Sequence, residues 1–92
     1  MTSPVEDVQV TVRYFAAARA AAGRAEQRFT VDRGATVQSL LDRVEEALPD
    51  AGSGRQVIAR CSVLHNGESG SGASASLADG DVIDLLPPFA GG

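Results

Sequence analysis

Residues 36–49 read Thr-Val-Gln-Ser-Leu-Leu-Asp-Arg-Val-Glu-Glu-Ala-Leu-Pro, and this stretch decides the fold. Its apolar side chains recur at helical spacing and form a single stripe made of Val37, Leu40, Leu41, Val44 and Leu48. Thr36 is a favourable N-cap, and Pro49 ends the helix because the residue before a proline avoids the α region. A helix with one apolar stripe must bury it, so the sequence predicts a helix packed on a sheet.

The segments around this helix are typical of strands. Residues 8–14 alternate apolar and polar side chains, and residues 25–31 do so around Phe29 and Val31. Residues 57–65 are rich in apolar and β-branched types, which predicts a third strand that ends at the Asn66-Gly67 turn. Residues 82–86 follow an Asp-Gly turn and predict the last strand.

Three further segments are predicted to connect these elements. Residues 16–22 are Ala-rich and precede Gly23, which predicts a short connecting helix outside the core. Residues 50–56 are predicted to form a surface loop. Residues 69–76 contain only Ser, Gly and Ala, which predicts a mobile loop with little bearing on the fold.

The predicted order is strand, short helix, strand, long helix, strand, strand. This order favours a two-layer α+β domain in which a mixed sheet packs on one main helix, and a ubiquitin-like β-grasp fits it. The chain has 92 residues, so we expect a single domain over residues 1–92.

Composition excludes several classes of protein. The formal net charge of −4 argues against nucleic-acid binding and against a polybasic membrane-surface protein. No apolar run has the length of a membrane span, and residues 1–7 lack the basic residues of a signal peptide. The single cysteine, Cys61, cannot form an internal disulfide, so we expect a cytoplasmic protein. All eight basic residues are Arg, so no Lys is available for acylation.

The catalytic inventory is small. Cys61 and the single histidine, His65, lie about 13 Å apart if both are on one strand, which is too far for a nucleophile and its base. Cys61 is therefore predicted to be a small buried residue and His65 a half-exposed residue at a strand end. Asp79, Asp81 and Asp84 are interpreted as residues of a solvated turn and strand face. The chain is predicted to have no enzymatic activity of its own and to bind no metal or cofactor.

The C-terminus carries the strongest functional signal. It reads Pro87, Pro88, Phe89, Ala90, Gly91 and Gly92. Two prolines end a strand because they lack N–H donors, and six residues reach at most roughly 20 Å. Gly91 and Gly92 have no Cβ and can enter a narrow channel, while Phe89 is predicted to anchor in a partner's pocket. We therefore predict a flexible tail over residues 87–92 that presents the Gly92 carboxylate to another protein.

Residues 77–92, Leu-Ala-Asp-Gly-Asp-Val-Ile-Asp-Leu-Leu-Pro-Pro-Phe-Ala-Gly-Gly, resemble the C-terminus of the molybdopterin synthase small-subunit family of ubiquitin-like sulfur carriers. Residues 10–16, Val-Thr-Val-Arg-Tyr-Phe-Ala, with Gly23, resemble the first strand and short helix of that family. Residues 64–67, Leu-His-Asn-Gly, resemble its third strand and turn. The likeness covers nearly the whole chain and is most specific in the last sixteen residues.

The resemblance implies a β-grasp fold and a role in molybdenum cofactor biosynthesis. It implies that a ubiquitin-activating-type enzyme uses ATP to adenylate the Gly92 carboxylate, which sulfur then converts to a thiocarboxylate. It also implies that the large subunit of molybdopterin synthase accepts residues 87–91 and uses the sulfur. Gly92 is the reacting residue under this interpretation, and ATP is bound by the activating partner and not by this chain.

Three other functions stay open. The chain could carry sulfur for thiazole or cysteine biosynthesis, although the proline pair before Phe89 favours molybdopterin. It could be a ubiquitin-like modifier joined to lysines of other proteins through Gly92. It could also be an interaction module whose tail has no chemical role.

Overall fold

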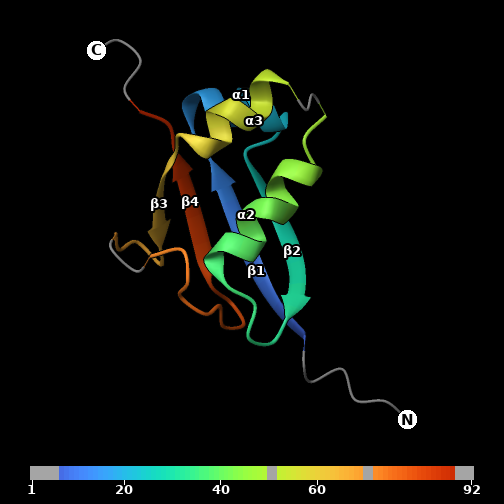
Figure 1. The fold of residues 1–92 in the computed structure, drawn as a ribbon, viewed down its shortest axis with the longest axis vertical. Helices are drawn as coiled ribbons and strands as arrows, with labels where there is room; N and C mark the ends of the chain where they lie inside the picture. Colours follow the sequence, from blue (N-terminus) through green and yellow to red (C-terminus); the bar gives the residue numbers. More distant parts are fainter. Residues whose placement is uncertain (1–6, 50–51, 70–71, 89–92) are drawn as a thin grey trace.

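Four strands form one mixed sheet, as predicted. The computed structural model describes residues 7–49, 52–69 and 72–88. The strands are β1 (Asp7–Tyr14), β2 (Glu26–Asp32), β3 (Ser62–His65) and β4 (Val82–Leu86). They lie in the order β2-β1-β4-β3, with β1 parallel to β4 and the other two neighbouring pairs antiparallel (Figure 1). The strands β1 and β4 are therefore central, and β2 and β3 are the two edges.

The main helix, α2 (Val37–Glu46), forms where its apolar stripe predicted it. The Ser39 N–H donates to Thr36 Oγ1 at 3.2 Å and the Thr36 N–H donates to Ser39 Oγ at 3.0 Å, which forms a capping box. Val37, Leu40 and Val44 are buried. The helix ends at Glu46, three residues before Pro49.

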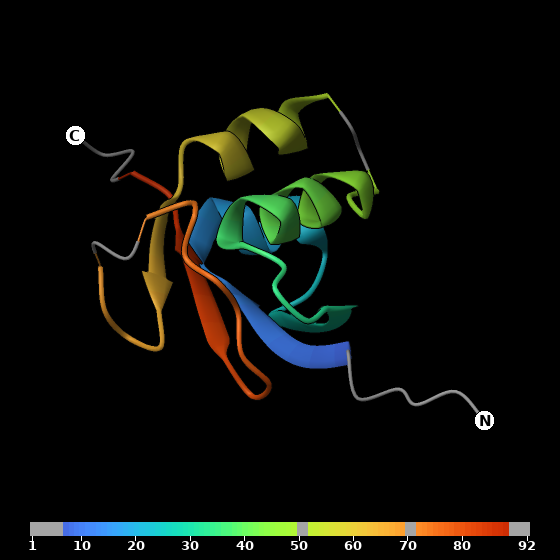
Figure 2. The same cartoon turned by 60° about the horizontal axis from the view of Figure 1, so that its bottom comes forward.

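Alternation along β1 separates the two faces of the sheet. Val8, Val10, Val12 and Tyr14 are buried, and they face the helices together with Ile83 and Leu85 of β4. The intervening residues of β1 lie on the opposite face, which none of the three described helices covers (Figure 2). The helices gather on one side of the sheet (Figure 2). This two-layer arrangement confirms the predicted α+β class and the β-grasp architecture.

The interpretation of residues 50–65 is wrong in part. Val57 and Ile58 belong to a third helix, α3 (Ser53–Ala59), and β3 has only four residues. A short apolar run does not distinguish strand from helix, and the glycines in this segment concealed the helix. Gly54 is buried, and a Cβ there would lie in ordinary van der Waals contact, 3.4 Å from Leu48 Cδ1 and 3.7 Å from Ala21 Cβ.

The first helix, α1 (Ala16–Ala22), forms as predicted but is not a mere connector. It ends at Gly23, whose φ of 79° is the left-handed conformation that favours glycine. Ala18 is fully buried within the hydrophobic core. The prediction that this helix lies outside the core is therefore wrong. An alanine buries little area, but its small side chain allows the helix to pack closely against its neighbours.

The prediction that residues 69–76, the Ser/Gly/Ala loop, have little bearing on the fold is also wrong for the residues of this loop that the structure describes. The N–H groups of Val37 and Gln38 donate to the carbonyls of Ala75 and Ala73, at 3.0 and 2.9 Å. The Leu77 N–H donates to the Ala35 carbonyl at 2.9 Å. This segment therefore satisfies backbone donors at the start of α2, a task that depends on backbone and not on side-chain type. No helix in the described ranges is long and apolar enough to cross a membrane.

Candidate functional site

The tail leaves the sheet at a rigid point. Leu85, the penultimate residue of β4, is fully buried, and its carbonyl accepts a hydrogen bond from the Phe15 N–H at 3.3 Å. Pro87 is half-buried and Pro88 is exposed. The chain thus passes from the core to the surface within three residues, beside α1 and α3 (Figure 1). The predicted site residues Phe89, Ala90, Gly91 and Gly92 lie outside the described residues.

A small apolar pocket adjoins this exit. It has a volume of about 140 Å³ and is lined by Ala17, Val57, Arg60, Pro87 and Pro88. Both prolines that were predicted to bind a partner therefore line it. Arg60 adds one guanidinium to an otherwise apolar wall. The sequence pattern did not indicate this pocket, because it forms only where α1, α3 and the end of β4 meet.

An exposed aromatic ring stands on the same end of the molecule. Phe15 is 39% exposed, and it is the largest apolar side chain of the described residues that is exposed. The Arg13 guanidinium lies 5.7 Å from the centroid of this ring. Arg13 is itself held by Asp84, with Nε 2.6 Å from Oδ1 and Nη2 3.0 Å from Oδ2. The hydrogen bond to Asp84 and its negative charge raise the pKa of Arg13. A ring fixed this way is a suitable anchor for a partner.

A buried carboxylate joins β3 to the start of β4, so the prediction of a solvated turn is wrong for Asp81. Its carboxylate lies 2.6 Å from His65 Nε2 and accepts hydrogen bonds from Asn66 Nδ2 and the Ala78 N–H, each at 2.9 Å. Asp84 is also buried, beneath Arg13. The sequence separation of these partners concealed both pairs.

Burial alone would raise the pKa of Asp81, but the hydrogen bonds from Asn66, Ala78 and His65, with the charge of His65, outweigh it and lower the pKa. A native pKa below the unfolded value of about 3.9 stabilises the fold at pH values above 3.9, and this stability is lost as the pH falls through the native pKa.

We therefore expect the urea concentration at the unfolding midpoint to decrease when the pH is lowered below about 4. Asp81→Asn should reduce stability near neutral pH by about 1–3 kcal/mol and flatten that dependence. If the Asp81→Asn variant lost stability below about pH 4 as steeply as the wild type, the role given to the Asp81 carboxylate would be wrong.

Cys61 packs against the core, as predicted, but it is half-buried and not fully buried. Its side chain is half-buried, and Sγ lies 3.3 Å from the Val57 carbonyl oxygen, to which it donates. Burial raises the pKa of the thiol to about 11, so it is protonated at neutral pH and a poor nucleophile. The part of the chain that the structure describes holds no group of three or more His, Cys, Asp or Glu residues able to bind a metal ion.

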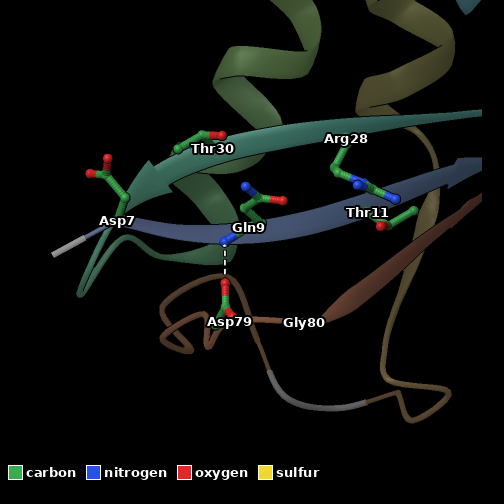
Figure 3. Close-up of a pocket in the computed structure, with 7 residues that line it drawn as sticks. All are labelled: Asp7, Gln9, Thr11, Arg28, Thr30, Asp79 and Gly80. Atoms are coloured by element: carbon green, nitrogen blue, oxygen red, sulfur yellow. Dashed lines mark hydrogen bonds between the residues drawn. The ribbon is translucent and has the colours of Figure 1, made fainter. Parts of the chain in front are cut away.

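A larger hollow lies on the helix-free face, beside the 79–80 turn (Figure 3). It is polar and has a volume of about 650 Å³; Asp7, Gln9, Thr11, Arg28, Thr30, Asp79 and Gly80 line it. The Asp79 carboxylate accepts from the Gln9 N–H at 2.7 Å, and the Gly80 N–H donates to the Gln9 carbonyl at 2.7 Å. The 79–80 turn therefore pairs with the backbone of Gln9, a residue of β1 that β4 does not reach, and its role is structural.

Comparison with characterised proteins places this geometry in a family. The molybdopterin synthase sulfur carrier subunit of Chlamydomonas reinhardtii is 35% identical over 86 residues, covering 92% of this chain and 100% of that protein. Small archaeal modifier protein 3 of Haloferax volcanii is 34% identical over 93 residues, with 92% and 100% coverage. Both relatives are matched along their whole length.

Solved structures agree with the fold. The crystal structure of SAMP1 from Haloferax volcanii has a TM-score of 0.79 at 32% identity, covering 91% of this chain and 99% of that one. A chain from the complex of subunits 1 and 2 of the molybdopterin-converting factor from Helicobacter pylori has a TM-score of 0.62 at 26% identity, with 92% and 100% coverage. A ubiquitin-like protein from Trypanosoma brucei, 14% identical, has a TM-score of 0.63, covers 91% of this chain and 98% of that one, and shares the fold alone.

The family model agrees with these pairwise matches. It covers residues 12–92, which run from the middle of β1 through the whole sheet to the terminal Gly-Gly. The sequence resemblance to ubiquitin-like sulfur carriers is thereby confirmed. The chain belongs to the ThiS family.

Proposed function

We propose that this protein carries sulfur for molybdopterin biosynthesis as the small subunit of molybdopterin synthase, with the sulfur held as a thiocarboxylate on Gly92. The observation that carries the proposal is the C-terminal arrangement. β4, whose central residues are buried, is followed at the surface by Pro87 and Pro88, and the sequence then reads Phe89, Ala90, Gly91 and Gly92. The full-length match to a sulfur carrier subunit supports it.

The chemistry needs a reactive terminus and a stable body. A carboxylate is a poor electrophile, so the activating enzyme transfers AMP from ATP to Gly92 and releases pyrophosphate. Hydrosulfide then attacks the carbonyl carbon, the bond to AMP breaks, and AMP leaves with its electron pair; the product is a thiocarboxylate, which is ionised at neutral pH and nucleophilic. This chain supplies the carbonyl carbon and its delivery, while the partners supply the catalytic groups. The chain therefore takes part in sulfur transfer as one component of a complex with these partners.

We expect the partners to bind the surface around Pro87 and Pro88, where the chain leaves the sheet. The large subunit and the activating enzyme must both admit Gly92, so each must contact the molecule near Pro87 and Pro88. The exposed Phe15 and the pocket lined by Ala17 and Val57 stand at that end. We propose that these features hold the body of the carrier while Phe89, Ala90 and Gly91 occupy the partner's channel.

The test is intact-mass analysis of the protein from its native cell. We expect a species in which sulfur has replaced one oxygen at the C-terminus, and we expect it to disappear when Gly92 is deleted. The deletion variant serves as the matched control because it retains every described residue. A wild-type extract that makes molybdopterin without any sulfurated species would refute the proposal.

A Phe15→Asp substitution tests the docking surface. Loss of an exposed aromatic anchor is expected to weaken binding to the activating enzyme by about 2 kcal/mol, roughly thirtyfold. Asp is a favourable residue at the position before α1, so the melting temperature should be retained. Glu68→Gln, an exposed position at the other end of β3, is the control and should bind normally. Equal affinity of both variants would show that Phe15 lies outside the interface.

A protein modifier is the second candidate, and the similarity to small archaeal modifier protein 3 favours it. In that case the activated Gly92 would be attacked by a lysine of another protein and form an isopeptide bond. The chain contains no Lys, so polymers linked through its own lysines cannot form. Blots should then show single high-mass adducts that vanish on deletion of Gly92. A sulfurated terminus without such adducts would favour the carrier.

A further inference from the structure

Among the described residues, no strand pairs with the outer edge of β2. β2 is the edge strand next to β1, at the opposite side of the sheet from β3 (Figure 1). The carbonyl of Thr30 accepts a hydrogen bond from Arg43 Nη1 at 3.1 Å, so this carbonyl points away from β1. In an antiparallel pair the N–H of the same residue points the same way, and the next outward-facing residues are two positions along. Arg28 and Thr30 therefore present backbone donors and acceptors along this edge.

A groove runs beside this edge, between β2 and α2. Its volume is about 250 Å³, and its lining is Val31, Asp32, Ala35, Ser39, Asp42, Arg43 and Glu46. Val31 and Ala35 form an apolar floor, because Val31 is buried and Ala35 half-buried. A strand added to β2 would point every second side chain into this groove.

The rim of the groove is acidic. Asp32, Asp42 and Glu46 are exposed and contribute three carboxylates against the single guanidinium of Arg43. That guanidinium is already engaged, since it donates to the Thr30 carbonyl and lies 5.7 Å from the centre of the Phe29 ring. Asp42 Oδ1 accepts a hydrogen bond from Gln38 Nε2 at 3.1 Å, and the exposed carboxylate keeps a second oxygen that could accept from a cation. The groove thus suits lysine or arginine side chains whose stems cover the apolar floor.

We propose that the β2 edge and the β2–α2 groove bind an extended, basic segment of a partner protein by strand addition. Backbone hydrogen bonds to Arg28 and Thr30 would supply affinity, and a guest N–H would replace Arg43 on the Thr30 carbonyl. Basic side chains of the guest would pair with Asp32, Asp42 and Glu46. The acidic rim selects against a second copy of this chain, because antiparallel pairing of two β2 strands about Phe29 would oppose Glu26 and Asp32.

This surface is separate from the sulfur-carrying end. It is formed by β2 and α2, whereas the tail leaves between α1, α3 and the end of β4. The proposal therefore stands whether the tail carries sulfur or modifies proteins. Substitutions in the groove leave the tail intact, so a failure of one proposal does not imply a failure of the other.

The test is a titration of the full-length, isotopically labelled protein with a short peptide in which Lys and Val alternate, followed by amide NMR. We expect the largest shifts at Arg28, Thr30 and Asp32. The double variant Asp42→Asn with Glu46→Gln should weaken binding by about tenfold or more. The control, Glu45→Gln with Glu68→Gln, changes the net charge equally outside the groove and should bind like the wild type.

Two control peptides separate strand addition from simple charge attraction. A peptide with Glu in place of Lys should not bind, and a Lys peptide with Pro at alternate positions should bind at least about tenfold more weakly because it lacks N–H donors. Equal binding of the Pro peptide, shifts centred on another face, or no saturable shift would overturn the proposal. A dimer in sedimentation analysis that pairs through β2 would also overturn it, because the occupant would then be a second copy.

Discussion

A Gly91→Val variant is expected to fold normally and to lose activation of Gly92 by at least about a hundredfold. The β-branched side chain widens the chain next to the reacting carbonyl, so it would prevent entry into a channel shaped for two residues without Cβ atoms. Folding should be retained because the described core extends from Val8 to Leu85, and Gly91 follows the end of β4 by five residues.

Two measurements separate these effects. Adenylation is followed by pyrophosphate release with the activating enzyme, and folding is followed by thermal unfolding. Gly91→Ala is the graded control, since a single methyl group should cost less activity than the isopropyl group. A large fall in melting temperature for Gly91→Val would show that the tail is part of the fold, and full activity would show that the channel is wide.

Leu40→Ala is expected to have the largest effect on stability. Leu40 lies in the first turn of α2 and is fully buried in the hydrophobic core that α2 shares with the sheet. Truncation of a buried leucine costs about 2–5 kcal/mol, because apolar contacts are lost and a cavity remains. For a domain of this size such a loss lowers the melting temperature by roughly 10 °C or more. Circular dichroism during heating and urea titration measure it.

Leu41→Ala is the matched control on the same helix. Leu41 is only half-buried, so the same chemical change should cost clearly less. Equal losses at the two positions would mean that helix propensity, and not the apolar stripe, determines the stability of α2. In that case the assigned packing of the apolar stripe of α2 on the sheet would need to be revised.

The amphipathic helix and the alternating strands could be predicted because their signals are local. The spacing of Leu40 and Val44 identifies a buried helix face, and the alternation from Val8 to Tyr14 identifies a half-buried strand. The turns at Asn66-Gly67 and Asp79-Gly80 were also predicted correctly, since glycine at positive φ is a local requirement.

The errors occurred where long-range packing overrides a local pattern. Gly52 is the N-cap of α3 and Gly54 lies within the helix; glycine is a poor helix former, yet the helix forms, with Gly54 buried beside Leu48 and Ala21. The Ser/Gly/Ala segment appeared free, yet Ala73 and Ala75 bond to the first turn of α2. Asp81 and Asp84 appeared solvated, but His65 and Arg13 reach them from distant positions in the chain.

The sequence by itself determined the β-grasp class, the family likeness and the identity of the terminal Gly-Gly, because these depend on periodicity and on residues that are adjacent in the chain. Only the tertiary structure decided which surfaces surround the tail exit and which edge of the sheet is open. The pairing order β2-β1-β4-β3 leaves the outer edge of β2 without a neighbouring strand among the described residues, beside the acidic rim of α2, and it brings Phe15 next to the end of β4. Strand order depends on contacts between segments far apart in sequence, which no local pattern encodes.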